Sequence, residues 1–120
     1  DLQYRFELGE QLVLAGHYKE AIPELQKARS NPNTRTRALS LLGRCYSERN
    51  MLDLAAKTLT DAAADIPGID GTKKDILYQL GLVYDRMGDP AKSLDCMKQI
   101  YEVDYNFLDV AQRVESSYSS

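Results

Sequence analysis

The chain has 120 residues, enough for one domain with a core of modest size. Its 43% hydrophobic and 28% charged residues are typical of folded globular proteins and not of disordered chains. A net charge of −3 argues against a nucleic-acid-binding protein, which needs a basic surface.

Apolar residues recur at helical spacing along the chain and predict pairs of helices. In the first pair, Leu8, Leu12 and Ala15 lie on one face before the turn AGHY. The proline-containing segments NPNT and IPGIDG end the first and second pairs, because the residue before a proline is disfavoured in a helix. These signals predict helices near residues 2–15, from the AGHY turn to residue 30, near 35–48 and near 52–65.

Capping signals mark a third pair of helices. Thr72, with Asp75 three residues later, is a variant of the capping box, and Asp89 followed by Pro90 suits the N-cap and first position of a helix. One more amphipathic helix is predicted over 106–118, with a wettable outer side that suits the end of a stack of helix pairs. Its apolar face comprises Phe107, Val110, Ala111 and Val114.

The helix pairs also repeat in sequence. Four residues of the first pair recur 34 positions later in the second, and a third copy follows after 38 positions because its linker is about four residues longer. The small residues at the matched positions predict close helix packing, and the large ones, Leu25, Leu59 and Met97, are expected to fill the space between repeats. The matched positions are Gly9, Ala21, Leu25 and Ala28; then Gly43, Ala55, Leu59 and Ala62; then Gly81, Ser93 and Met97.

These residues give the sequence a resemblance to the tetratricopeptide repeat family. The motifs are LGEQL…GHY…A…L…A…NP and LGRCY…N…A…L…A…IP, while the third copy departs from the pattern at Ser93, Ile100 and Tyr105. The resemblance implies an all-α right-handed superhelix of three helix-turn-helix repeats, and we expect it to be the C-terminal part of a larger protein. The repeats are expected at 2–34, 36–69 and 74–105, with a capping helix at 106–118.

The resemblance further implies a concave groove, lined by the first helix of each repeat, that binds a peptide or helix of a partner protein. The basic clamp by which some family members grip chaperone C-termini is not retained, since Phe6, Glu10 and Asp75 stand at its positions. The repeat register assigns to the groove Phe6, Glu10, Val13, Leu14, Arg37, Arg44, Tyr78, Leu82 and Arg86.

The mixture of groove residues suggests the chemistry of the partner. Arg37 and Arg44 lie two helical turns apart and suit a carboxylate, so we hypothesise a partner segment with apolar anchors and an acidic group. In the alternative interpretation, Phe6, Val13 and Leu14 pack on helices upstream of the sequence, and Arg44 pairs with Glu10.

Self-association is a further alternative. The first helix carries Leu2, Tyr4 and Phe6 and is more apolar than a terminal helix should be. Such a helix predicts either additional repeats upstream or stacking against a second copy, which would make the chain a structural module or a homo-oligomer.

Catalysis is disfavoured. His17 is the only histidine and falls in a predicted turn, and Cys45 and Cys96 match no metal or redox spacing and are expected to be reduced core residues. No glycine-rich phosphate loop is present. The sequence therefore predicts a non-catalytic protein-binding scaffold that requires no cofactor or metal.

Overall fold

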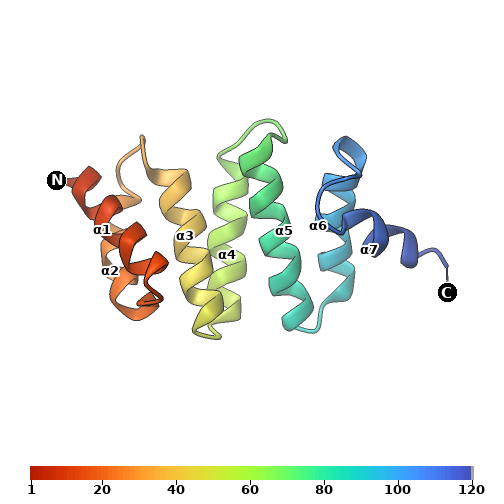
Figure 1. The fold of residues 1–120 in the computed structure, drawn as a ribbon, viewed down its shortest axis with the longest axis horizontal. Helices are drawn as coiled ribbons and strands as arrows, with labels where there is room; N and C mark the ends of the chain where they lie inside the picture. Colours follow the sequence, from red (N-terminus) through yellow and green to blue (C-terminus); the bar gives the residue numbers. More distant parts are fainter. Residues whose placement is uncertain (120) are drawn as a thin grey trace. The chain divides into compact units, whose positions relative to one another are not determined.

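The computed structural model describes residues 1–119, which form seven helices and no strand (Figure 1). Successive helices pack as pairs, α1 with α2, α3 with α4, and α5 with α6, which confirms the predicted all-α fold of helix pairs. No helix in this part of the chain is long and apolar enough to cross a membrane. The helices are α1 (Leu2–Leu14), α2 (Tyr18–Ala28), α3 (Arg35–Glu48), α4 (Leu52–Ala64), α5 (Gly71–Arg86), α6 (Pro90–Val103) and α7 (Val110–Ser116).

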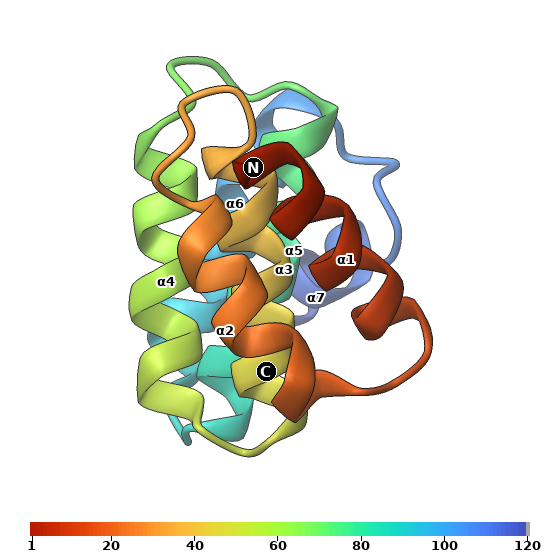
Figure 2. The same cartoon turned by 90° about the vertical axis from the view of Figure 1, so that its left-hand side faces the viewer.

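The chain divides into two compact units, each with its own core. Unit 1 is Asp1–Asp65 and holds α1 to α4; unit 2 begins at Ile66 and holds α5 to α7. Within unit 1, α1 and α2 run antiparallel, as Figure 2 shows, and α3 contacts both. Within unit 2, α7 packs on α6. The core of unit 2 is the buried cluster Leu77, Met97, Ile100, Val110 and Val114.

The two helices of each pair are in tight contact at the repeat glycine. A β-carbon on Gly9 would lie 2.7 Å from Cγ of Leu25, and one on Gly81 would lie 2.6 Å from Cε of Met97. The prediction that these glycines permit close helix packing is therefore confirmed. Leu25 and Met97 lie against the glycine of their own repeat. They therefore pack inside a helix pair, and not only between repeats as the sequence predicted.

The corners between paired helices share one backbone geometry. Gly16, Asn50 and Gly88 have φ values of 80°, 61° and 79°, in the left-handed region that favours glycine and asparagine. The next residue in each corner donates its N–H to the carbonyl five residues earlier, as His17 does to Leu12 at 2.8 Å. This bond is typical of a Schellman motif, so AGHY is a helix corner that recurs in every repeat.

Two helix boundaries differ from the predictions. Asp70 caps α5 by accepting a 2.8 Å hydrogen bond from the Lys73 N–H, so the prediction that Thr72 caps this helix is wrong. The last helix begins at Val110, later than the predicted residue 106, because Leu108 has a φ of 43° that a helix does not allow. The predicted cap at Asp89 is confirmed by its 3.1 Å hydrogen bond from the Lys92 N–H.

Candidate partner-binding surface

The groove positions of α1 divide into buried and exposed residues. Phe6 and Val13 are 2% and 1% exposed, whereas Leu14 is 70% exposed. This corrects the sequence-based assignment of Phe6 and Val13 to the groove, since core side chains offer almost no surface to a partner. Their burial is complete within the described chain, so it requires no helix upstream.

The two groove arginines of α3 remain accessible. The Arg37 guanidinium lies over the Phe6 ring, 4.6 Å from its centroid, so the buried ring holds an exposed cation in place. Arg44 is exposed and forms no hydrogen bond or ion pair with any residue that the structure describes. The alternative in which Arg44 pairs with Glu10 is therefore not observed. Seven residues of helix place the two arginines about 10.5 Å apart along one face of α3.

In unit 2, two of the three groove positions of α5, Tyr78 and Leu82, are partly covered by the chain's own C-terminal segment. The Tyr78 hydroxyl donates a 2.6 Å hydrogen bond to Oδ1 of Asp109, and the Tyr78 ring packs edge-on against Phe107 at 6.1 Å. Leu82 is partly buried against the cluster that contains Val110. Arg86 is exposed in the last turn of α5. The segment before α7 thus occupies part of the surface that the repeat register assigned to a partner.

A chain of charged contacts fastens this segment to α5. The Arg113 guanidinium bonds to Asp109 at 2.9 Å and to Asp85 at 3.2 Å. The Tyr78 hydroxyl and then Arg113 hold the pKa of the Asp109 carboxyl below its usual range. Burial, followed by the hydrogen bond to Asp109, raises the pKa of Tyr78.

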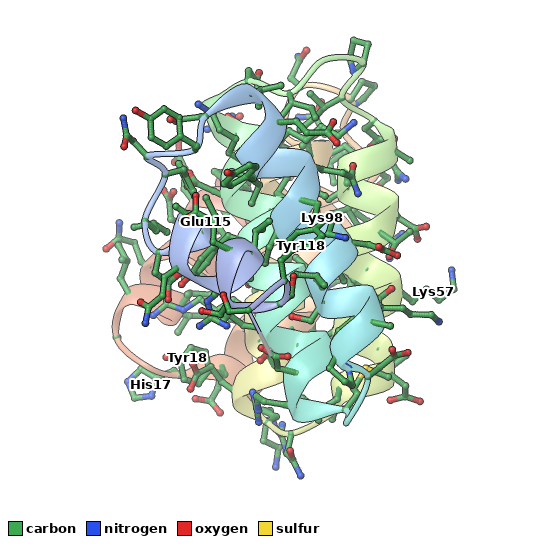
Figure 3. All side chains as sticks on the ribbon, turned by 90° about the vertical axis from the view of Figure 1, so that its right-hand side faces the viewer. His17, Tyr18, Lys57, Lys98, Glu115 and Tyr118 are labelled. Carbon is green, nitrogen blue, oxygen red and sulfur yellow. The ribbon has the colours of Figure 1, made fainter. Side chains whose placement is uncertain are left out.

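The residues considered for catalysis are not arranged for it. His17 lies at the exposed corner after α1, with its ring 3.5 Å from the Glu20 carboxylate (Figure 3). Cys45 and Cys96 are free and buried, and burial raises the pKa of each thiol to about 11, which suppresses the reactive thiolate. The described residues contain no cluster of three or more side chains suited to a metal ion.

The architecture is that of a helical repeat protein, and comparison with known families specifies which kind. Models of the tetratricopeptide repeat match residues 12–70 and 75–107, so the chain belongs to the tetratricopeptide repeat family. Proteins of this family are typically non-catalytic scaffolds for protein interactions, and the repeats of this chain support the role of a protein-interaction scaffold.

Solved structures share the fold at low sequence identity. A crystal structure of MamA superposes with a TM-score of 0.84 at 24% identity, and the match covers 99% of this chain and 67% of MamA. YrrB, described as a TPR protein with an unusual peptide-binding site, superposes with a TM-score of 0.79 at 22% identity, covering 100% of this chain and 58% of YrrB. The chain thus spans about three-fifths to two-thirds of the length of these proteins. A comparison with curated protein sequences finds no match.

Proposed function

We propose that the chain binds a segment of a partner protein on the surface formed by Glu10, Leu14, Arg37 and Arg44, which we call the α1/α3 surface. The observation that carries this proposal is that the two arginines are exposed and lack ion-pair partners among the described residues. Both are exposed on one face of α3, and neither forms an ion pair with a carboxylate of the described chain. Unpaired arginines at this spacing suit an acidic group on a partner.

The contact between Arg37 and Phe6 favours binding. A long arginine side chain normally loses conformational freedom when it forms a contact, and this loss opposes binding. Because the guanidinium already rests over the Phe6 ring, part of that freedom is lost before a partner arrives. Arg37 is therefore the preorganised member of the pair, and Arg44 is the adaptable one.

Leu14 and Glu10 supply the rest of the recognition. Leu14 is 70% exposed at the end of α1, a helix that contacts α3, so an apolar partner residue gains by covering it. Glu10 is half-buried one turn earlier on α1 and repels an acidic group. The acidic group of the partner is therefore directed to α3, which fixes the orientation of the bound segment.

The described peptide-binding site of YrrB supports this proposal at the level of the fold. A protein of closely similar architecture binds peptides, although an identity of 22% carries over no particular residue. The residues of the α1/α3 surface are assigned here from their own exposure and charge.

Selection of displayed peptides on the full chain tests the proposal. We expect enrichment of segments that combine an acidic residue with an apolar one, and loss of their binding in the double variant Arg37→Ala, Arg44→Ala. The matched control is Lys19→Ala, Lys27→Ala, which removes the same charge from exposed positions of α2. Equal loss in both variants would show a nonspecific charge effect, and enrichment of basic or purely apolar peptides would refute the proposed chemistry.

Self-association through the N-terminal helix is the second candidate, and a different observation favours it. Leu2 and Tyr4 of α1 are 38% and 57% exposed. Leu8 is only partly buried, whereas its equivalents Leu42 and Leu80 are buried. A second copy covering this side would complete the burial. Analytical ultracentrifugation decides the question: a monomer from micromolar to near-millimolar concentration would refute self-association.

A further inference from the structure

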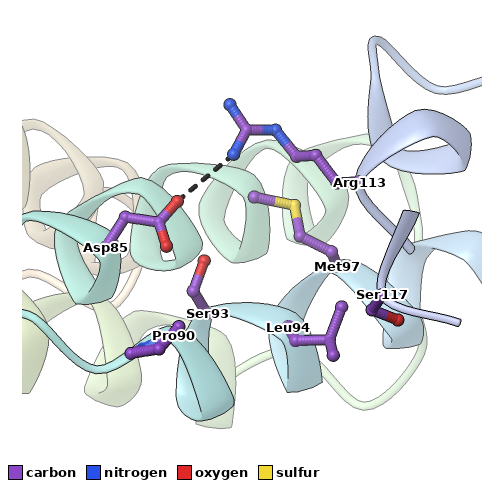
Figure 4. A pocket seen from close by; sticks show the side chains of 7 residues that line it. All are labelled: Asp85, Pro90, Ser93, Leu94, Met97, Arg113 and Ser117. Atoms are coloured by element: carbon purple, nitrogen blue, oxygen red, sulfur yellow. Dashed lines mark hydrogen bonds and ion pairs between the residues drawn. The ribbon is translucent and has the colours of Figure 1, made fainter. Parts of the chain in front are cut away.

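Unit 2 contains a cavity of about 270 Å³ where the ends of α5, α6 and α7 meet (Figure 4). Pro90, Leu94 and Met97 of α6 form its apolar wall. The ion pair between Asp85 of α5 and Arg113 of α7 crosses one side at 3.2 Å. The cavity lies outside the α1/α3 surface, so an inference about it goes beyond the proposed function.

The hydroxyl of Ser93 is a polar group in the cavity wall that the fold does not require. It stands at the repeat position of Ala21 and Ala55, both fully buried, so alanine satisfies the helix packing there. Ser93 is 4% exposed, and its hydroxyl forms no hydrogen bond with any residue in the described part of the chain. Figure 4 shows this hydroxyl pointing into the space beneath the Asp85–Arg113 pair. The Ser93 oxygen is not fully enclosed by protein atoms, so it is open to the cavity and can exchange a hydrogen bond with a ligand there.

The charges around the cavity indicate a neutral ligand. Asp85 and Arg113 form an ion pair across the rim, Arg113 is also held by Asp109 outside the lining, and no other lining residue is charged. An anion would find the charge of Arg113 already shared by two carboxylates, and a cation would find Asp85 already paired, so an ionic ligand would lose its hydration with little compensation. A group with a large apolar body and one neutral polar end matches the wall and the hydroxyl together.

We propose that this cavity binds a tyrosine side chain of a partner protein. The aromatic ring packs against Pro90, Leu94 and Met97, whose thioether is a favourable neighbour for a ring. The phenol exchanges a hydrogen bond with the Ser93 hydroxyl. Tyrosine combines an apolar body with a polar end and is enriched at the centres of protein interfaces, so it satisfies both features of the cavity.

The test uses N-acetyl-tyrosinamide and N-acetyl-phenylalaninamide as probes on the full chain. Titration is followed by NMR of the Leu94 and Met97 methyl groups. We expect millimolar binding of the tyrosine probe that shifts both methyl signals, and binding of the phenylalanine probe weaker by about 3- to 10-fold, the effect of one hydrogen bond. Equal affinities, or no shift of these signals, would overturn the proposal.

Two variants separate the proposed role of Ser93 from a merely structural one. Ser93→Ala restores the residue of the other repeats and should fold normally, while reducing the affinity of the tyrosine probe to that of the phenylalanine probe. Ser117→Trp places a bulky ring on a residue lining the cavity and should abolish binding; Ser116→Trp, one residue earlier and outside the lining, should not. Unchanged preference for the tyrosine probe in Ser93→Ala, or unchanged binding in Ser117→Trp, would refute the site.

Discussion

Leu59 occupies the space that a side chain on Gly43 would need. A β-carbon built on this glycine would lie 2.5 Å from Cγ of Leu59, closer than real carbon atoms pack. The contact joins α3 to α4 in the second repeat, and the same relationship joins Gly9 to Leu25 in the first. The helix pair is therefore held at a separation that only glycine permits.

Replacement of Gly43 by alanine should therefore destabilise the protein. The added carbon forces Leu59 to move inside a fully buried site, at a cost of about 1–3 kcal/mol in the free energy of unfolding. Urea unfolding measures this cost. Gly68→Ala is the control, because nothing lies within 4 Å of its β-carbon position. Similar unfolding midpoints for the two variants would contradict the packing argument.

The corner glycine Gly88 supports a second prediction. Its φ of 79° is costly for any residue with a β-carbon, so Gly88→Ala should lose about 1–2 kcal/mol of stability although nothing lies within 4 Å. Asn50 adopts φ 61° at the equivalent corner, as expected for a position that favours glycine or asparagine. Gly71→Ala, also in open space but without a positive φ, serves as control in thermal unfolding. Equal melting temperatures for Gly88→Ala and Gly71→Ala would disprove the strain.

The Tyr78–Asp109 hydrogen bond predicts a dependence of stability on pH. The pKa of Asp109 is lowered in the folded protein, mainly by this bond. Its contribution is therefore present above the pKa of unfolded aspartate, about 3.9, and is lost as the pH falls through the lower folded value. Tyr78→Phe should reduce stability at pH 7 by about 1 kcal/mol and weaken the loss between pH 4 and pH 2.5. Urea midpoints at each pH provide the measurement.

Tyr101→Phe is the matched control for this experiment. Its hydroxyl also donates to a carboxylate, that of Glu115 at 3.0 Å, but the bond is exposed to solvent. We expect a smaller change in the midpoint at pH 7 than for Tyr78→Phe. If the two phenylalanine variants lose equal stability, the Tyr78–Asp109 bond is not a special attachment of the C-terminal segment.

The cysteines should be unreactive in the folded protein. Burial raises the pKa of Cys45 and Cys96 to about 11, so at pH 8 only about one thiol in a thousand is ionised, and access is blocked as well. A colourimetric thiol reagent should react slowly in buffer and rapidly in denaturing urea. Fast reaction of either thiol in buffer would contradict its placement in the core.

The repeat pattern predicted the helices and corners because both depend on local signals. Gly16, Asn50 and Gly88 fall at one repeat position and adopt one left-handed geometry. The error at the start of α5 has a local cause too: Asp70 and Thr72 are both good capping residues, and the spacing of Asp75 favoured the wrong one.

The exposure of the groove positions could not be predicted from the sequence, because it depends on which neighbouring residues cover them. The positions equivalent to Phe6 and Val13 in the other repeats are partly or fully exposed, yet Phe6 and Val13 are buried in unit 1. Tyr78 is covered by a segment that was interpreted only as a terminal cap, and nothing in the repeat register pairs it with Phe107 and Asp109. The absence of a hydrogen-bond partner for the Ser93 hydroxyl among the described residues could likewise be found only from the folded structure.

The most direct test of the α1/α3 surface is a double-mutant cycle on one selected acidic peptide. Fluorescence anisotropy gives the affinities of this peptide and of its counterpart with an amide in place of the carboxylate, for the original chain and for Arg37→Ala, Arg44→Ala. We predict that the amide binds the original chain about tenfold more weakly and that the difference disappears in the double variant, because the charge is recognised by these arginines. If replacing the carboxylate by an amide weakens binding equally for the original chain and the double variant, the acidic group is bound elsewhere and the account is contradicted.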